Sequence, residues 1–219
     1  MKVLIVTVMD RSGSMQSIRE DMEGGYAAFI AGHAAADPET HGECRVSLYE
    51  FSSRQVHGSA WYKAVYERTP VAEVPRYVLS PDGGTALHDA VGKAITDTAA
   101  GIRDHHDWRP DKVYIVIVTD GEGNSSLVFS NATLQPLVEA KQEQGWEFLY
   151  LGANQDAFKE GSGMGIAAAA TMDWAPDQSR HMYKSATGAT LRSRGAGGQS
   201  VSYTPEERAA AAGEPEEKK

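Results

Sequence analysis

The chain has 219 residues, 41% of them hydrophobic, and carries 21 Lys and Arg against 30 Asp and Glu, a formal net charge of −9. This length and composition predict one globular domain with a substantial core. The acidic balance, without a basic stripe, argues against a nucleic-acid partner. No apolar run approaches the roughly 20 residues of a membrane helix, and the first residues do not resemble a secretory signal, so we expect a cytoplasmic protein with no membrane partner.

The single cysteine, Cys44, cannot form an internal disulfide. It lies beside a strand-like segment and is expected to be a small buried hydrophobe, which fits a reducing compartment.

The first third of the sequence predicts a strand, a helix and a hairpin. Residues 3–8 form a continuous Val/Ile/Leu-rich run typical of a strand buried on both faces. Apolar residues at helical spacing predict an amphipathic helix from Ile18 to residue 36, where the Asp-Pro pair at residues 37–38 ends the pattern. Residues 45–51 and 56–62 alternate and predict a hairpin whose outer strand is antiparallel at the sheet edge, whereas residues 63–79 are expected to be irregular.

A Ser-Pro-Asp-Gly-Gly turn at residues 80–84 delivers Thr85 to a position at or near the N-cap of a helix that extends to Ile102. Alone, Thr85 would be interpreted as a cap. The histidines His88, His105 and His106 show no paired ligand spacing, so we expect surface residues rather than a zinc site.

The second half alternates strands and helices again. Residues 112–119 predict a central buried strand ending at Asp120, and residues 146–151 another, with a helix at 134–144 between them. A short helix is expected at 155–160. Residues 166–172 fit either a strand or a helix, and we favour a final edge strand.

The C-terminal part predicts a helix over residues 177–192, a flexible linker at 195–199, a short capped helix at 204–212 and a charged end. We therefore expect a domain over residues 1–194 and a tail over 195–219. The whole pattern predicts an α/β fold: a doubly wound, mostly parallel six-stranded sheet with one antiparallel edge strand and helices on both faces.

Oxygen-bearing side chains mark the ends of the two most apolar strands. Asp10, Ser12 and Ser14 alternate along one segment in which Gly13 permits a tight loop, and Asp120 ends the other strand. The carboxyl ends of parallel strands are where open α/β sheets bind ligands. Carboxylate and hydroxyl oxygens suit a hard divalent cation.

Three segments in this order, residues 10–15, 83–87 and 118–121, resemble the metal-ion-dependent adhesion site (MIDAS) of von Willebrand factor A (VWA) domains, which have a Rossmann-like fold. The resemblance covers roughly residues 1–172. It implies that Ser12 and Ser14 coordinate the cation directly, and that Thr85, Asp10 and Asp120 do so directly or through water. The implied cation is Mg²⁺ or Mn²⁺, and no other cofactor is expected.

This resemblance implies a protein-binding module, an adaptor or scaffold in which an Asp or Glu of a protein partner fills the open coordination position. Arg11 and Met15 are expected to face that partner, Arg11 as a charge and Met15 as an apolar contact; the alternative for Arg11 is a solvated side chain without a role in binding. Residues 148–158 and 201–208 also resemble small standalone VWA proteins of bacteria and tailed bacteriophages. The location implied is a bacterial cell or a phage-infected host.

Two alternatives share the cation. A metal-dependent hydrolase or phosphotransferase with an aspartate nucleophile needs a second acid two residues on, where this chain has Ser12, and no G-x-S-x-G, P-loop or dinucleotide fingerprint is present. We therefore expect no enzyme activity. A tellurite-resistance or stress-type VWA adaptor also fits, and the sequence does not fix its partner or oligomeric state.

Overall fold

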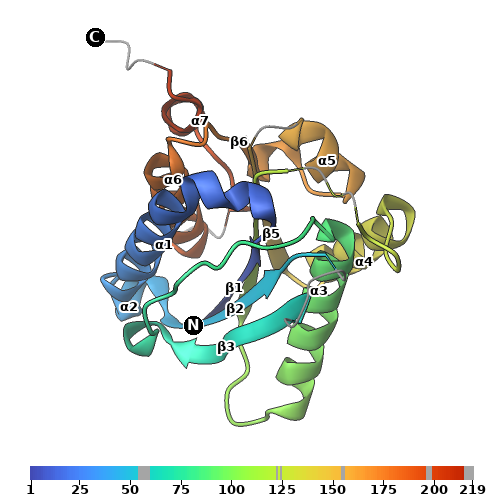
Figure 1. The fold of residues 1–219 in the computed structure, drawn as a ribbon. Coiled ribbons are helices and arrows are strands. Elements are labelled where there is room, and N and C mark those ends of the chain that lie inside the picture. The colour runs from blue at the N-terminus through green and yellow to red at the C-terminus, as the bar shows by residue number, and fades with distance from the viewer. Residues whose placement is uncertain (54–59, 122, 124, 154–155, 196–198, 215–219) are drawn as a thin grey trace.

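A computed structural model describes residues 1–53, 60–121, 123, 125–153, 156–195 and 199–214. Within this part, six strands form one sheet in the order β3-β2-β1-β4-β5-β6 (Figure 1). The strands are β1 (Lys2–Asp10), β2 (Glu43–Phe51), β3 (Tyr62–Pro70), β4 (Lys112–Thr119), β5 (Trp146–Gly152) and β6 (Thr171–Asp173).

The sheet is parallel except at one edge. β1 pairs in parallel with β2 and β4, β4 with β5, and β5 with β6, while β3 pairs antiparallel with β2. The predicted mixed α/β sheet with one antiparallel edge strand is confirmed. Because Asp10 lies opposite Phe51 and Met9 opposite Val118, the strands that carry the candidate ligands end at the same edge.

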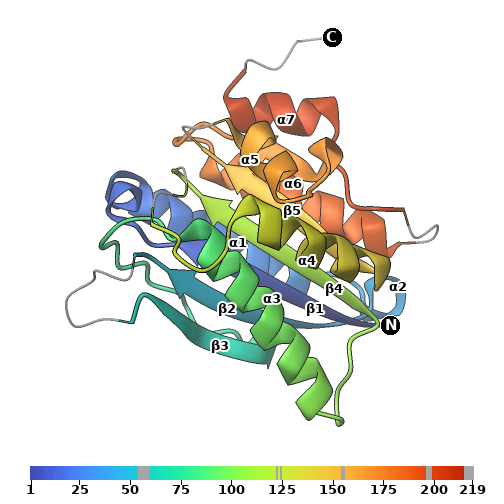
Figure 2. The same cartoon turned by 90° about the vertical axis from the view of Figure 1, so that its right-hand side faces the viewer.

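Helices cover both faces of the sheet. Figure 2 shows α3 (Leu87–Asp104) and α4 (Asn131–Glu143) on one face, with α1 (Arg19–Ala34) and α6 (Ser179–Arg194) behind it. α1 and α6 pack closely because α1 presents glycine at the crossing: a Cβ on Gly25 would lie 2.6 Å from the Tyr183 ring, and one on Gly32 would lie 2.9 Å from Thr187 Cγ2.

The remaining elements are short. They are η1 (Gly13–Ile18), α2 (Pro38–His41), η2 (Val71–Glu73), α5 (Ala157–Gly163), η3 (Ala168–Ala170) and α7 (Pro205–Ala212). Along the described stretches of the chain, none of the helices combines the length and the apolar character that a bilayer-spanning segment requires.

The two apolar runs form the centre of the core. Every residue of β1 after Lys2 is buried, and so is every residue of β4 after Lys112. Both strands have helices on each side, which is why their sequences do not alternate. Cys44 is buried with a free thiol, as predicted.

The predicted hairpin is wrong in its second strand. Of the segment 56–62, residues 56–59 lie outside the described part of the chain, and β3 begins only at Tyr62 and continues to Pro70 through residues predicted to be irregular. Backbone pairing with β2 determines where β3 begins and ends. The register of this antiparallel pair shifts between Val46 and Tyr49. Such irregularity blurs the alternation, and Pro70 is tolerated because the strand is an edge.

The segment 166–172 is only partly a strand. Its alanines form the 3₁₀ turn η3, and β6 covers just Thr171–Asp173. Alanine has little preference for strands, so pairing with β5 extends only over the last residues. The predicted helices at 18–36, 134–144 and 177–192 are present with ends shifted by a few residues, as α1, α4 and α6.

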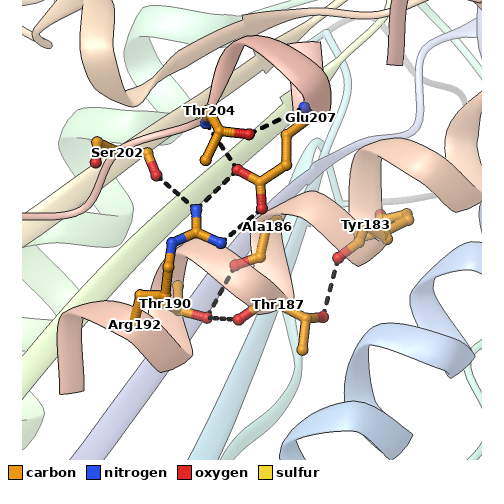
Figure 3. Close-up of polar contacts among 8 residues, drawn as sticks. All are labelled: Tyr183, Ala186, Thr187, Thr190, Arg192, Ser202, Thr204 and Glu207. Carbon is orange, nitrogen blue, oxygen red and sulfur yellow. Dashed lines mark hydrogen bonds and ion pairs between the residues drawn. The ribbon is translucent and has the colours of Figure 1, made fainter. Parts of the chain in front are cut away.

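The segment after α6 returns along that helix. Thr204 caps α7 by accepting a hydrogen bond from Glu207 N, with Pro205 in the first turn, so the predicted capped helix is present. Arg192 holds the segment through two 2.7 Å contacts with the Glu207 carboxylate and a 2.9 Å hydrogen bond to Ser202 O (Figure 3). This paired geometry is the stronger form of an arginine–carboxylate contact.

The hydrophobic core extends beyond Arg194. Val201, Tyr203 and Ala211 are buried members of the same core cluster as the strands. The expected domain boundary after residue 194 stays a prediction, which truncation tests. The predicted linker at 195–199 lies partly outside the described residues.

Candidate metal centre

Three loops meet at the carboxyl edge of the sheet. Gly13 N donates a 2.9 Å hydrogen bond to Gly83 O, and Asp82 N donates one of 2.7 Å to Arg11 O. Across the sheet, Ser14 Oγ donates to Asp120 Oδ1 at 2.8 Å. The three segments that the sequence analysis singled out are therefore in contact, each within one or two hydrogen bonds of the next.

Asp10 is the buried base of this cluster. Its Oδ1 accepts a 2.7 Å hydrogen bond from Ser12 N, and its Oδ2 accepts one of 2.6 Å from Thr119 Oγ1. The pKa of Asp10 is raised to about 7, mainly by burial; the two hydrogen bonds oppose this rise and the nearby charge of Asp120 adds to it. A positive charge at this point would favour the ionised carboxylate.

A chain of oxygens leads from Ser12 to the third loop. Ser12 Oγ lies 3.0 Å from Ser14 Oγ, which in turn contacts Asp120. Burial also raises the pKa of Asp120. Ser14 itself is exposed, so solvent reaches the cluster from this side.

Thr85 lies beside the third loop. It is buried and precedes Ala86, the N-cap of α3, so it lies near the cap as predicted but is not the cap residue. A Cβ placed on Gly121 would lie 3.9 Å from Thr85 Oγ1, and Ser125 N donates to Thr85 O at 3.1 Å. The hydroxyl of Thr85 is thus close to the backbone that follows Asp120.

This donor set fits a hard divalent cation. It offers carboxylate and hydroxyl oxygens, which hard cations prefer. The described residues contain no grouping of three or more His, Cys, Asp or Glu side chains that could hold a metal ion, so a cation here would depend on the hydroxyls as well as on the two carboxylates. Each Asp10 oxygen accepts one hydrogen bond and keeps a further lone pair that a cation or a cation-bound water can use. Mg²⁺ retains waters readily, so such a shell is reasonable.

Comparison with known proteins identifies the fold. No protein-family model and no curated protein matches the sequence. Among solved structures, proximal thread matrix protein 1 from the mussel byssus matches with a TM-score of 0.59 at 14% identity, covering 82% of this chain and 45% of that one. The open form of the pilus adhesin SpaC from Lactobacillus rhamnosus GG matches with a TM-score of 0.62 at 15% identity, covering 87% and 30%.

A von Willebrand factor type A structure from Catenulispora acidiphila also matches, with a TM-score of 0.50 at 18% identity over 87% of this chain and 42% of that one. This chain has the fold of a von Willebrand factor A domain. It spans less than half the length of each of these proteins. One structure of the byssus protein has a zinc-occupied MIDAS motif.

Arg11 does not face a partner in this VWA fold. It is buried, its Nε lies 3.4 Å from Glu50 Oε1, and its Nη2 donates to Ala60 O at 2.9 Å. Met15 is fully buried in the core. The prediction that Arg11 and Met15 contact the partner is therefore wrong: between the ligands of a tight loop, alternate side chains point inward, and these two are long enough to fill the interior.

The histidines divide into two groups. His105 and His106 are exposed, as predicted. His88 is not a surface residue, because its side chain is only 14% exposed and its Nε2 lies 3.6 Å from Glu160 Oε2. α5 carries Glu160 against the start of α3, a contact between distant parts of the sequence that no local pattern indicates.

Three side chains that hold the loops of the candidate site were not predicted. Thr119 bonds Asp10, Ser53 Oγ accepts from Gly84 N at 2.9 Å, and the Asp89 carboxylate accepts the backbone N–H groups of residues 127–129. The position of Thr119 next to Asp120 is a usable sequence signal. Ser53 and Asp89 look like an ordinary turn serine and an ordinary first-turn helix acid.

Proposed function

We propose that this protein is a divalent-metal-dependent protein-binding module, an adaptor or scaffold. Asp10, Ser12, Ser14, Thr85 and Asp120 would hold Mg²⁺ or Mn²⁺, and an Asp or Glu of a protein partner would complete the coordination shell. The observation that carries the proposal is the contact between Ser14 and Asp120, 2.8 Å long across 106 residues of sequence, which joins two of the ligand loops.

The chemistry of the site supports an open coordination position. Only two of the five proposed ligands are charged, and neutral hydroxyls and waters donate little electron density, so the cation still attracts a further anionic ligand. The exposed Ser14 leaves the cluster accessible from outside. An acidic side chain of another protein is a ligand of the right charge and reach.

Calorimetric titration with Mg²⁺ and Mn²⁺ tests the metal site. Removing a charged or hydroxyl ligand by Asp120→Ala or Thr85→Ala is expected to weaken binding by about 10- to 100-fold or more, comparable to losses at other metal sites. Asp107→Ala, which removes an exposed acid on the connection between α3 and β4, is the matched control and should bind as the wild type does. Equal affinity of all variants would contradict the proposal.

Partner capture tests the acidic-ligand step. Proteins retained from a host extract in Mg²⁺ are compared with those retained in EDTA and with those retained by Thr85→Ala. For a retained partner, changing its contacting acid to the amide should abolish binding, because a neutral carbonyl is the weaker ligand. Binding indifferent to EDTA, to Thr85 and to that acid would place the interface elsewhere.

We further propose that the protein has no enzymatic activity and acts inside a bacterial or phage-infected cell. Among the described residues, no observation favours the hydrolase or phosphotransferase alternative over binding. A stress-type adaptor would use the same site, so the identity of the captured partner decides between these adaptor roles.

A further inference from the structure

The loop that follows Asp120 exposes large apolar side chains. Leu127 is 77% exposed and Val128 is 65% exposed, the highest values among the large hydrophobic residues of the described chain. The next residue, Phe129, points the other way: a Cβ on Gly92 of α3 would lie 2.7 Å from its ring. Phe129 thus anchors the loop to α3, and Leu127 and Val128 are left outside.

This loop is held rigidly. Asp89 is buried, and its carboxylate accepts hydrogen bonds from Leu127 N at 2.9 Å, Val128 N at 2.8 Å and Phe129 N at 2.7 Å. Asp89 N in turn donates to Ser126 Oγ at 3.3 Å. Three hydrogen bonds to one carboxylate fix the backbone, so Leu127 and Val128 are presented at a set position and little ordering entropy would be lost on contact.

The exposed pair lies on the loop that contacts the proposed metal ligand Thr85. Ser125 N donates to Thr85 O at 3.1 Å, and Leu127 is two residues further along the chain. Two residues reach at most about 7 Å, so Leu127 lies within roughly 12 Å of Thr85. An extended peptide of about four residues spans that distance.

The surroundings suit an acidic segment with an apolar side chain. Residues 125–130, Ser-Ser-Leu-Val-Phe-Ser, carry no charge, although the chain as a whole has a formal charge of −9. A segment whose acid is attracted to the cation is therefore not repelled by this loop. Beside it lies a cavity of about 250 Å³. Its lining combines the apolar Trp61, Val128 and Phe129 with Thr96 and the charged Asp89, Lys93 and Asp97.

We infer that Leu127 and Val128 are specificity-determining residues of the metal-dependent interface. The occupant is a partner segment that places an Asp or Glu on the cation and a large apolar side chain, within four residues of that acid, against Leu127, Val128 and the adjoining cavity. This inference rests on the proposed function, and it names the partner's recognition pattern.

A displayed peptide library with a fixed central Asp and five random positions on each side tests the pattern. It is selected on the full chain in Mg²⁺ and in EDTA, with wild type, Leu127→Ser/Val128→Ser and the control Val65→Ser, an exposed valine on the edge strand β3. Thermal unfolding should be the same for wild type and the double variant, because both side chains are exposed.

We expect Mg²⁺-dependent peptides enriched in Leu, Ile, Met or Phe within four positions of the Asp. The double variant should lose that enrichment while still selecting in Mg²⁺, and should bind a wild-type-selected peptide about tenfold more weakly or worse, whereas Val65→Ser behaves as wild type. Magnesium-dependent selection without apolar enrichment, or enrichment unchanged in the double variant, overturns the inference and leaves the proposed function standing. Selection that is equal in EDTA overturns both.

Discussion

Buried charged groups lie at both edges of the sheet, and they differ in what surrounds them. At the carboxyl edge, Asp10 and Asp120 belong to a carboxylate cluster with Ser12 and Ser14. Toward the amino ends of the strands lies an arginine cluster. There Arg194 Nη2 is 3.2 Å from His33 Nδ1, and its guanidinium lies 5.4 Å from the centre of the Tyr114 ring.

Burial keeps the titratable neighbours of Arg194 neutral. Burial lowers the pKa of His33 well below its ordinary range, and the charge of Arg194 lowers it further. Burial raises the pKa of the Cys44 thiol, although Arg194 acts against that shift. Nε and Nη1 of Arg194 make no hydrogen bond within the described part of the protein.

The carboxylate cluster instead places two like charges side by side, next to solvent. The repulsion between Asp10 and Asp120 is relieved either by protonation or by a cation. The comparison teaches that burial of charge alone does not mark a binding site. What distinguishes the carboxylate cluster is that loops from three parts of the chain converge on it and leave it accessible.

Truncation after Arg194 should give the largest effect on stability. A fragment of residues 1–194 is expected to fold cooperatively and to bind Mg²⁺ as the full chain does, because no proposed ligand is lost. It should be less stable by about 3–6 kcal/mol, the worth of burying Val201 and Tyr203. Denaturant unfolding and calorimetry measure both quantities. An insoluble fragment would show that the domain does not end at residue 194.

Asp10→Asn should change how stability depends on pH. In EDTA the raised pKa of Asp10, about 7 against an ordinary 3.8, means that the folded state keeps its proton while the unfolded chain loses it. The protonated Asp10 therefore adds to the free energy of unfolding of the wild type. This contribution is complete below about pH 4 and is lost as the pH rises through 7, and it amounts to at most about 4 kcal/mol.

The measurement is the difference in unfolding free energy between Asp10→Asn and wild type from pH 4 to 8. The variant should gain on the wild type as pH rises in EDTA, and saturating Mg²⁺ should reduce this gain by stabilising the ionised wild type. A difference that is constant with pH would mean that Asp10 titrates normally.

Arg11→Met should destabilise the fold by about 3 kcal/mol, because it leaves the buried Glu50 carboxylate with Lys63, 2.8 Å away, as its one cationic partner among the described residues. Arg76→Met, at an arginine whose side chain is 83% exposed, is the control and should change stability by less than about 0.5 kcal/mol. Equal effects of the two substitutions in urea unfolding would argue that Arg11 is not held as the structure has it.

His33→Gln should give the smallest effect, with the opposite sign of pH dependence from Asp10. Because the pKa of His33 is lowered in the folded state, its contribution to stability is complete above the ordinary value of 6.5 and is lost as pH falls below it. The free energy of unfolding changes through His33 by at most about 1.4 kcal/mol per pH unit. Unfolding from pH 7.5 to 5 should show the variant losing less than wild type, with the exposed His105→Gln as control.

Local pattern was enough for the main elements and for a mostly parallel six-stranded sheet with one antiparallel edge strand. Apolar runs gave β1 and β4, helical spacing gave α1 and α3, and the three motif segments proved to be neighbours. It failed at β3, where a register shift hides the alternation, and at Arg11 and Met15, which are buried although they stand between proposed ligands. Side-chain direction within a tight loop depends on space left by other segments, which no local pattern records.

The sequence by itself determined that buried parallel strands end in oxygen-bearing loops, because continuous apolar runs and their polar ends follow from burial alone. Only the tertiary structure decided which groups support those loops. Glu50 pairs with Arg11, Thr119 bonds Asp10, and Asp89 fixes the exposed loop of Leu127, each across a distance set by the packing of whole elements. Such contacts depend on the relative positions of strands and helices, and these are fixed by the sum of many weak interactions over the entire chain.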